Sequence, residues 1–504
     1  MGEAKRKRLA RQHQLVAVDT FGGRVHVEWN PSAAVTPLGQ LPFFTQFLQV
    51  SGLFDAWVKD CPLAYQSNNA SGKREVLATL LLSILAGHQR YAHINGIRQD
   101  TVHPQLLGVK QLVSEDAARR ALQKIDEAYG KTWLDDHLGR ATTPLLGTPW
   151  ILDLDATVKC LYGKQEGAVV GYNPKKPGRP SHSYHSAMMA NARLALRVDV
   201  TPGNASAPAH AMPGIWAWLD SLPQNERPTL LRGDIAYGNE AVLKEAEVRA
   251  QHYLSKLKLT TNVKALIKKV FRNMNWENAG AGWEGVEDVL SLSGWSRSRS
   301  AVVVLRRKIT GQMLVTGKDE FQDQLAFLEM EGIPTARYEY AVLVTSTHHP
   351  ILTIAQLYRD RADCENNFDE LKNQWGWGGF TTQDLARCQL MARMVALVYN
   401  WWTLFVRLAA PHKHLEAITS RPLLLHGVAT QTKHSGQTRL TITSTHAKQG
   451  LIQAVLTNIA QFLSSLKATA EQLTDQERLQ LILHRAFAKY LLKPPKLLMQ
   501  IAGT

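Results

Sequence analysis

The sequence predicts an α/β protein with a mainly β insertion and helical regions at both ends, and three observations carry this prediction. Short apolar runs alternate with helical stretches between residues 148 and 274, which is the pattern of an α/β sheet. β signals predominate from Trp283 to Thr347. Helical periodicity marks the residues up to about 140 and those after 383.

Residues 1–147 are expected to form a mainly helical region. One stripe of apolar side chains repeats at helical spacing: Leu77, Leu80, Leu81, Ile84 and Leu85. The surrounding apolar run, Val76 to Gly87, is shorter than the roughly 20 residues that cross a bilayer, so it predicts a buried helix. Ser114, followed by two acids, is typical of an N-cap. The helix that it opens carries Arg119 and Arg120 and belongs either to a helix-turn-helix or to ordinary packing.

Residues 148–274 predict the first part of an α/β core. The run from Pro149 ends as a buried strand in Asp153 and Asp155. Further strands are expected at Arg193–Val200 and Pro228–Asp234, with a helix at Ala209–Leu222 between them. Because the ends of neighbouring strands converge, Asp155 and Asp234 are expected to meet.

Residues 275–350 predict a β-rich insertion, with strands at Ala301–Leu305 and Tyr340–Thr345 and a turn near Asp319–Met330. Residues 351–382 return to the core as one helix, which Thr353 caps and the glycines near Trp375 to Gly379 end.

Residues 383–504 are expected to form a helical C-terminal region. Three helices are predicted there: Gln383–Arg407, Gly450–Ala468 and Thr474–Leu492. The polar connection Ala409–Thr445 predicts neither helix nor strand.

Composition limits the classes of partner and compartment. The 504 residues carry a formal net charge of +15 with a pI near 9.6, which favours a polyanionic partner, nucleic acid rather than membrane. The four cysteines are widely separated, which argues against a zinc ribbon or a secreted disulfide framework. Lys5 to Arg11 is basic, but no long apolar segment follows, so no secretory signal is predicted and a cytoplasmic protein is expected.

The acidic residues predict phosphodiester chemistry. Two divalent ions about 3.5 to 4 Å apart can stabilise the attacking and leaving oxygens, and such ions require carboxylate ligands. Two aspartates are too few, and Glu365 supplies a third acid. At about 100° per residue, Tyr358, Arg361, Glu365 and Lys372 share one narrow helix face. The cations, one or two turns from Glu365, are expected to hold phosphates without competing with the metal ions.

These four residues also carry a family resemblance. Their spacing matches Y-x2-R-x3-E-x6-K, which resembles the signature of cut-and-paste insertion-sequence transposases of the DDE type. DAT at 155–157 and GDIAYGNE at 233–240 are similar to the first-aspartate and second-aspartate segments of that family. The resemblance covers roughly residues 150 to 380.

The resemblance implies a ribonuclease-H-like catalytic core and two Mg²⁺ or Mn²⁺ ions per active site. In it, Asp155, Asp234 and Glu365 are the catalytic metal ligands, with Asp153 as an alternative first acid because residues two apart on a strand point the same way. Thr157 favours Asp155. Tyr358, Arg361 and Lys372 would bind DNA phosphates.

The resemblance also implies the reaction and the partners. Hydrolysis at the transposon end exposes a 3′-hydroxyl, and in relatives with this signature that hydroxyl forms a DNA hairpin, which is reopened before target DNA is attacked. The partners would be double-stranded DNA, both terminal inverted repeats and target, and a second protomer. By association, residues 1–147 would bind DNA and residues 383–504 would contribute to dimerisation.

Other features have a DNA-binding and a structural interpretation. The loop containing Lys175, Lys176 and Arg179 either contacts DNA or is a solvated turn. Trp295 either stacks on a flipped base, as in related transposases, or belongs to the core. Two rival functions stay open. One is a metal-dependent nuclease or resolvase without strand transfer, and the other is a domesticated DNA-binding protein without catalysis.

Overall fold

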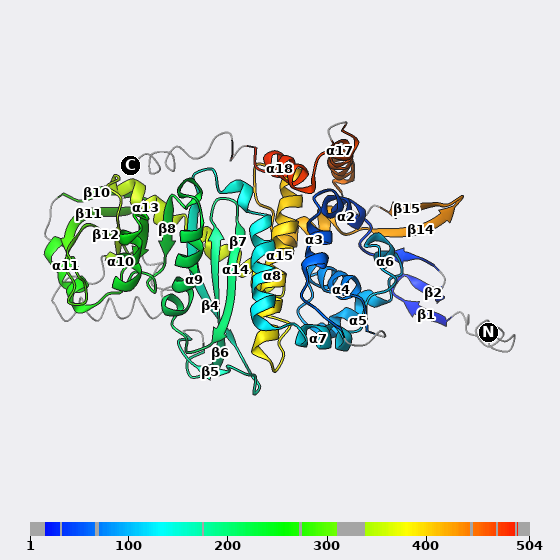
Figure 1. The fold of residues 1–504 in the computed structure, drawn as a ribbon, viewed down its shortest axis with the longest axis horizontal. Coiled ribbons are helices and arrows are strands. Elements are labelled where there is room, and N and C mark those ends of the chain that lie inside the picture. The colour runs from blue at the N-terminus through cyan, green and yellow to red at the C-terminus, as the bar shows by residue number, and fades with distance from the viewer. Residues whose placement is uncertain are drawn as a thin grey trace.

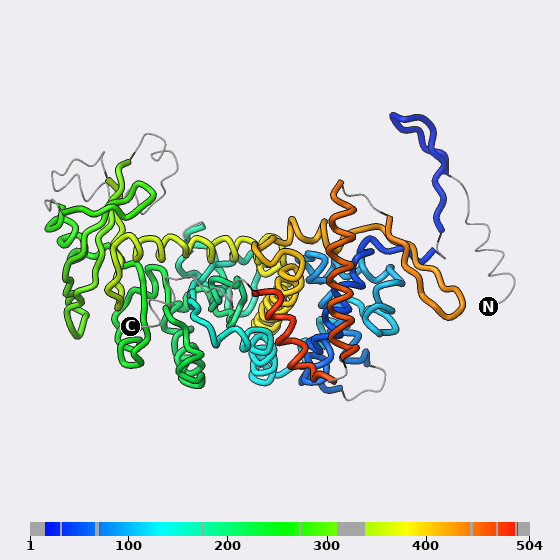
Figure 2. Tube along the Cα trace, turned by 90° about the horizontal axis from the view of Figure 1, so that it is seen from above, coloured from blue at the N-terminus to red at the C-terminus, as the bar shows by residue number. Residues whose placement is uncertain are grey.

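The computed structural model describes residues 16–30, 33–65, 70–173, 176–271, 275–309, 338–443, 447–469, 472–488 and 491. The molecule is elongated: a large mixed sheet with its helices occupies one end, and a helical body occupies the other (Figure 1). Two β-hairpins project from the helical body (Figure 2). The predicted mixed α/β class is confirmed.

The helices have the following bounds: α2 Leu41–Val50, α3 Leu53–Asp60, α4 Lys73–Leu85, α5 Ile94–Arg98, α6 Val102–Leu106, α7 Glu115–Gln123, α8 Glu127–Arg140, α9 Ala207–Ser221, α10 Glu240–Val248, α11 Thr261–Phe271, α13 Ile351–Arg359, α14 Ala362–Gln374, α15 Leu385–Ala409, α16 Ala417–Leu424, α17 Gln449–Ala468 and α18 Asp475–Ala486. Among these described helices, none combines the length and the apolar character needed to span a bilayer.

The strands have the following bounds: β1 Val16–Thr20, β2 Gly23–Val27, β3 Val35–Thr36, β4 Ile151–Cys160, β5 Val169–Val170, β6 Pro180–Met189, β7 Leu194–Pro202, β8 Leu230–Gly233, β9 Tyr253–Lys256, β10 Glu277–Gly280, β11 Trp283–Leu290, β12 Arg299–Lys308, β13 Tyr338–Thr345, β14 Val428–His434 and β15 Gln437–Thr443. The main sheet has the order β10-β11-β12-β13-β9-β8-β4-β6-β5, and β7 also pairs with β6.

Strand direction divides this sheet. β4, β6 and β7 are successive antiparallel neighbours, whereas β4, β8 and β9 run parallel. The strands of residues 275–350 do not stand apart, because β13 pairs antiparallel with β9 and so extends the core sheet. In the β4–β8 register Leu154 lies opposite Gly233, so the next residues, Asp155 and Asp234, follow at the same level of the sheet.

The two faces of the sheet are covered by different helices. α13 packs on one face over a separate apolar cluster that includes Ile151, Leu230 and Leu343 from the strands and Ile354 from the helix. α9 packs on the other face against β6. α13 and α14 follow one another along the back of the molecule (Figures 1 and 2). The face bearing Asp153 and Asp155 is therefore the face beneath the glutamate helix.

The long helix α15 closes the edge of the sheet at β7. Three of its buried polar side chains bond to the backbone of that strand: Asn400 pairs with both backbone groups of Ala195 at 2.8 and 2.7 Å, Arg393 donates to the Val198 carbonyl at 3.0 Å, and Gln389 donates to the Val200 carbonyl at 2.8 Å. An exposed edge strand would otherwise offer unpaired backbone groups. α15 thus joins the sheet to the helical body.

The helical body is built from both ends of the chain. α2 packs against α17, α18 packs against α15, and β3 near the N-terminus pairs with β14. Ser114 is an N-cap as predicted, and Thr474, at the start of a predicted helix, forms a capping box with Glu477. The segment left unassigned, residues 409–445, contains α16 and the β14–β15 hairpin. The polar composition hid this hairpin, since both its strands are largely exposed.

The glutamate helix differs from its prediction in two ways. It begins at Ile351 after Pro350, so Thr353 is not its N-cap. It is also interrupted at Asp360 and Arg361, where Arg361 N bonds to the Tyr358 carbonyl at 3.1 Å and Cys364 N to the Arg361 carbonyl at 2.9 Å. Such bonds to the third residue back tighten the helix, and a narrower turn changes the direction of the side chains beyond it.

Candidate active site

Asp155 lies in the middle of β4, on the face that α14 covers. The residue is 8% exposed. One carboxylate oxygen, Oδ1, accepts a hydrogen bond from the Ala156 backbone at 2.8 Å, and the other, Oδ2, pairs with Nη2 of Arg361 at 2.9 Å. The strand therefore holds the carboxylate in a fixed position beneath the helix.

Asp234 lies in the tight turn that follows β8. Its Oδ1 accepts from the Ala236 backbone at 2.9 Å, and its carbonyl accepts from the Tyr237 backbone at 3.2 Å. Gly233 is required before it, because a Cβ there would lie 2.5 Å from the Cβ of buried Tyr237. The turn then enters α10 through the side chain of Asn239, which accepts from Val242. The GDIAYGN segment is thus a strand-turn-cap unit that presents one carboxylate.

Glu365 lies in the first turn of α14 and is exposed. Arg361 connects it to the sheet: Nη1 donates to Glu365 Oε1 at 3.1 Å while Nη2 holds Asp155. The expectation that Arg361 leaves the acids to the metal ions is therefore wrong for this conformation, because its guanidinium lies between two of them. The interrupted helix turns Arg361 inward, and its side chain is only 6% exposed.

The pKa values show that the acids share one electrostatic environment. Burial raises the pKa of Asp155 to about 7, Arg361 opposes this, and the negative charges of Asp234 and Glu365 add to it. Burial also raises the pKa of Tyr358, where Arg361 again opposes and the same three acids contribute. Burial disfavours the charge of Arg361, but Asp155, Tyr358 and Asp234 together outweigh burial and raise the pKa of Arg361. Charges interact in this way only at short range inside a protein.

Lys372, Thr157 and Lys159 continue the site along β4, and of these the sequence did not single out Lys159. Lys372 Nζ donates to the Thr157 hydroxyl, two positions beyond Asp155. Two positions further, Lys159 Nζ donates to the Gly379 carbonyl at 3.2 Å, and burial lowers the pKa of Lys159 to about 8. The alternation of side chains along a strand was the signal for Thr157 and Lys159.

Asp153 is buried and fully paired. Its two oxygens accept from Nε and Nη2 of Arg232, both at 2.6 Å. Arg232 also donates to the Leu357 carbonyl at the end of α13. Because both oxygens are engaged and both side chains are almost inaccessible, Asp153 would have to break a buried ion pair in order to bind metal.

The basic loop lies beyond the end of β4. Lys176 donates to the Tyr162 hydroxyl at 2.6 Å, and the Arg179 guanidinium lies 4.9 Å from the centre of the Tyr162 ring. All three side chains are exposed, so the loop presents cations and an aromatic ring to solvent. Lys175 lies outside the described residues. Sequence reasoning missed Tyr162, whose only signal was its position just after the strand.

Trp295 is half-buried in the loop between β11 and β12. The Arg299 guanidinium lies 4.5 Å from its ring centre and donates to Glu240 at 2.7 Å and to Glu247 at 2.8 Å. Both acids belong to α10, the helix that follows the Asp234 turn. The loop is therefore attached to the same unit that positions the second aspartate.

The donor set suits a hard divalent cation, although it is not preassembled. In the described ranges no three Asp, Glu, His or Cys side chains already surround a common metal position. Asp155, Asp234 and Glu365 nevertheless provide only carboxylate oxygens, and their mutual repulsion raises the pKa of Asp155 in addition to its burial. A cation relieves such repulsion. At present Arg361 supplies the positive charge.

Comparison with known proteins decides the family. A family model described as "Transposase DDE domain" matches residues 146–401, just over half of the chain. The chain belongs to this family. The match runs from the residues before β4 to the middle of α15, so this DDE domain includes the sheet, its insertion and the helix that closes its edge. The ribonuclease-H-like α/β core expected from the sequence is confirmed.

No curated protein matches the chain. Among solved structures, a chain from a cryo-EM structure of a piggyBac transposase synaptic complex with hairpin DNA is similar, with 10% identity and a TM-score of 0.35 over 89% of this chain and 86% of that one. That similarity is too low to carry an argument about individual residues.

Proposed function

We propose that this DDE-domain chain is the transposase of a bacterial insertion sequence, which cuts the ends of its element and joins the 3′-hydroxyls to target DNA. The observation that carries the proposal is the convergence of Asp155, Asp234 and Glu365, with Tyr358 and Arg361, in one electrostatic environment beneath the glutamate helix. The family match supplies the general class of activity.

In this proposal Asp155, Asp234 and Glu365 hold two Mg²⁺ or Mn²⁺ ions, which activate the attacking oxygen and stabilise the leaving one. Burial of Asp155 keeps bulk water from its carboxylate. The protein's own cations would bind the DNA backbone: Arg361 and Lys372 hold phosphates next to the acids, and Lys176 and Arg179 hold them further along β4. Tyr358, half-buried beside the acids, would donate its hydroxyl to a phosphate oxygen.

Arg361 has two alternative partners in this scheme. Without DNA its guanidinium neutralises Asp155 and Glu365 at 2.9 and 3.1 Å. A phosphate in the site offers it bidentate acceptors, and its transfer to that phosphate would release both acids at the moment when DNA arrives. The cations thus do compete with metal in the free protein, and DNA relieves the competition.

The proposal assigns roles to the other parts of the chain. Residues 1–147 would bind the terminal inverted repeats, residues 383–504 would contribute to a homodimer that pairs two ends, and the protein would act in the cytoplasm. Trp295, stacked on Arg299, would receive a base displaced from the DNA end. The two end regions share one helical body, so DNA binding and pairing would be mechanically connected.

The direct tests, both in Mg²⁺, are a cleavage assay with an uncut element end and a strand-joining assay with a precut end and supercoiled plasmid. Asp155→Asn, Asp234→Asn and Glu365→Gln are each expected to lower both cleavage and joining by more than about 100-fold. Asp369→Asn is the matched control, since Asp369 is exposed on the same helix and bonds only to Asn373 at 2.7 Å among the interactions found for it. Cleavage without joining would favour a nuclease or resolvase, and full activity of the three variants would favour a non-catalytic DNA-binding protein.

A further inference from the structure

A second basic site lies on the opposite face of α14 from Glu365. At about 100° per residue, Asp363 and Glu370 lie roughly 160° and 140° from Glu365 around the helix. On that side a hollow of about 400 Å³ opens between α14, the turn joining β6 to β7, the end of α15 and the loop before α16. Nothing in the proposed catalytic scheme uses it.

Arg407 is the unusual residue of this hollow. It lies in the last turn of α15 and is 9% exposed. Its Nε is buried without a hydrogen-bond partner, and within the described part of the chain no hydrogen bond or ion pair engages its guanidinium. The contact found for the group is with the ring of Phe487, whose centre is 5.5 Å away. A largely buried cation without an acceptor from the protein is costly, which favours an anionic ligand at this guanidinium.

The acids around the hollow are already engaged elsewhere. Asp363 pairs with Arg193 at 2.9 Å and is largely exposed. Glu370 is buried and pairs with His414 at 2.7 Å. Glu416 accepts from Gln374 at 2.7 Å. Each carboxylate thus serves a partner other than Arg407.

Apart from Asn191, the remaining lining residues are arginine, lysine and histidine. Arg193, His412 and Lys413 face the hollow with Arg407, and the two latter loop residues are exposed. Burial lowers the pKa of Arg407, Tyr399 opposes this, and the positive charge of Arg193, which lines the same hollow, lowers it further. Two arginines that converge without a shared carboxylate form a fork suited to a tetrahedral oxyanion.

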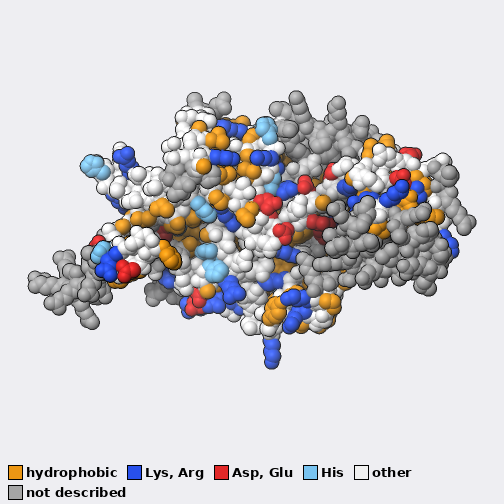
Figure 3. Space-filling view, turned by 180° about the vertical axis from the view of Figure 1, so that it is seen from behind, with side chains coloured by type: hydrophobic (Ala, Val, Ile, Leu, Met, Phe, Trp, Pro, Cys, Tyr) orange, Lys and Arg blue, Asp and Glu red, His pale blue; other side chains and the backbone are white. Residues whose placement is uncertain are grey.

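The acids and cations of the face bearing α14 are visible together in Figure 3, which views the molecule from behind. Acidic side chains gather near the middle of this face, and lysines and arginines lie on both sides of them. A polyanion that approaches the acids would meet basic side chains on either side.

We propose that this hollow binds a phosphate group through Arg407 and Arg193, with Lys413 at its rim. The binding of phosphate itself stands on the geometry alone. Its source in the cell, which we take to be a DNA backbone phosphate flanking the active site, rests on the proposed function. Occupancy would place a second phosphate contact behind the helix that carries Glu365 and would fix the turn beside the α14 N-terminus.

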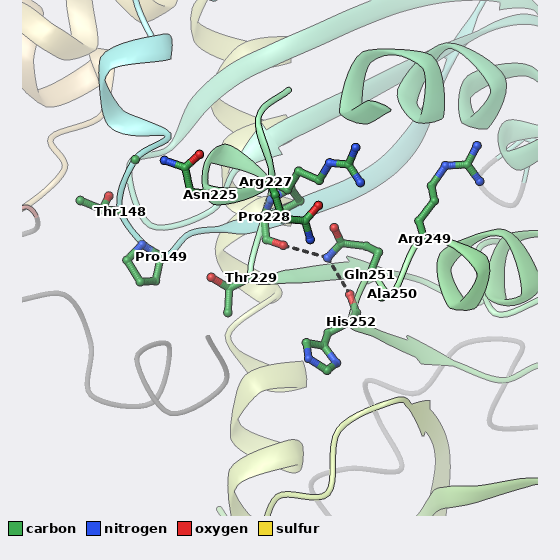
Figure 4. Close-up of a pocket in the computed structure, with 12 residues that line it drawn as sticks. Thr148, Pro149, Asn225, Arg227, Pro228, Thr229, Arg249, Ala250, Gln251 and His252 are labelled. Carbon is green, nitrogen blue, oxygen red and sulfur yellow. Dashed lines mark hydrogen bonds between the residues drawn. The ribbon is translucent and has the colours of Figure 1, made fainter. Parts of the chain in front are cut away.

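Another hollow of the molecule is a basic pocket whose two arginines have a carboxylate partner, although the Nε of Arg227 is also buried without a hydrogen bond among the described residues. It measures about 340 Å³ and opens near the starts of β4 and β8. There Arg249 and Arg227 share Asp220 at 3.0 and 3.9 Å, and Gln251 donates to the Pro228 carbonyl at 2.8 Å (Figure 4). Both arginines have a carboxylate close by, which Arg407 lacks.

The test compares the full chain in sodium phosphate and in sodium chloride at equal ionic strength. Phosphate is expected to raise the thermal midpoint by at least about 2 °C more than chloride, because it binds only the folded state. Arg407→Gln should abolish this difference, and Lys413→Ala, an exposed change, should weaken phosphate binding about threefold by calorimetry. Arg485→Gln is the matched control, since that exposed guanidinium stacks on Phe462 outside the hollow.

A second arm identifies the source of the phosphate. Binding to a duplex of unrelated sequence is measured at several salt concentrations. When Arg407 is replaced, the slope of log K against log salt concentration should become about 0.9 less steep. If Arg407→Gln lost phosphate binding but kept the same salt dependence of DNA binding, the site would be supported and its ligand would be a free phosphate ion. An equal phosphate shift in Arg407→Gln and in the unmodified chain would overturn the proposal. The phosphate-binding measurement can still be interpreted if the protein does not join strands. The phosphate site and the proposed transposase function can therefore be refuted independently.

Discussion

The two aspartates of β4 are expected to respond in opposite ways to the same substitution, although they lie two residues apart. Asp155→Asn removes a carboxylate whose burial raises its pKa from an ordinary 3.8 to about 7. Because the folded-state pKa lies above the unfolded one, the ionised carboxylate destabilises the fold. The penalty is absent below pH 3.8, grows as the pH rises and is complete above about pH 7.

This penalty can be put into numbers. At about 1.4 kcal/mol per pH unit, it amounts to roughly 4 kcal/mol above pH 7 and about 1.6 kcal/mol at pH 5. Asn resembles the protonated form of Asp155. The raised pKa of Asp155 already includes its attraction to Arg361, so the loss of that ion pair is contained in these free energies. Asp155→Asn should therefore stabilise the metal-free protein, and more so at pH 8 than at pH 5, while abolishing DNA cleavage.

Asp153→Asn should do the reverse. The substitution removes the carboxylate that Arg232 binds through two nitrogens. Arg232, which is 1% exposed, then keeps, among the described residues, only its hydrogen bond to the Leu357 carbonyl. Breaking a buried pair of this kind costs about 3 to 5 kcal/mol. Asp153→Asn should lose DNA cleavage only because it unfolds, and its cleavage activity should return at a lower temperature at which it is folded.

Urea unfolding at pH 5, 6.5 and 8 in EDTA, together with the cleavage assay, checks both variants. Asp369→Asn, which is exposed, should stay within about 0.5 kcal/mol of the unmodified chain at every pH. If Asp153→Asn kept its stability and lost cleavage while Asp155→Asn still cut DNA, the assignment of Asp155 as first acid would be refuted.

Three further outcomes are expected. Arg361→Gln should tighten Mn²⁺ binding in the absence of DNA, because the guanidinium no longer neutralises Asp155, and it should weaken DNA binding, because a proposed phosphate contact is lost. Calorimetry well above pH 7 measures both affinities. An unchanged Mn²⁺ affinity would contradict the proposed competition between Arg361 and metal. Arg299→Gln should remove part of the stability that the protein loses between pH 4.5 and pH 2, since Arg299, together with Arg297 and Tyr253, lowers the pKa of Glu247 to about 2 against the effect of burial. Acid titration of the unfolding midpoint tests this. Thr474→Ala should cost about 1 kcal/mol in urea unfolding through loss of the capping box, with no change in DNA cleavage.

The sequence by itself determined the fold class, the positions of the main strands and helices, and the three acids of the candidate site. Local patterns suffice for these features: short apolar runs at the start of β4 and in β8 lead into carboxylates, although β4 continues past Asp155 to Cys160. The Ser114 cap follows from its own neighbours. The spacing around Glu365 pointed to the family that the comparison then showed.

Tertiary structure decided what each of these residues contacts. Asp153 and Asp155 look equivalent along the strand, and only the neighbouring strand distinguishes them, because Arg232 lies opposite Asp153 in the β4–β8 register. Arg361 pairs with Asp155 beside the tightened turn at residues 360 and 361, a contact that no side-chain pattern announced. The hollow around Arg407 brings together four segments remote in the chain. Local sequence fixes secondary structure through short-range preferences, whereas the partners of buried charges depend on long-range packing.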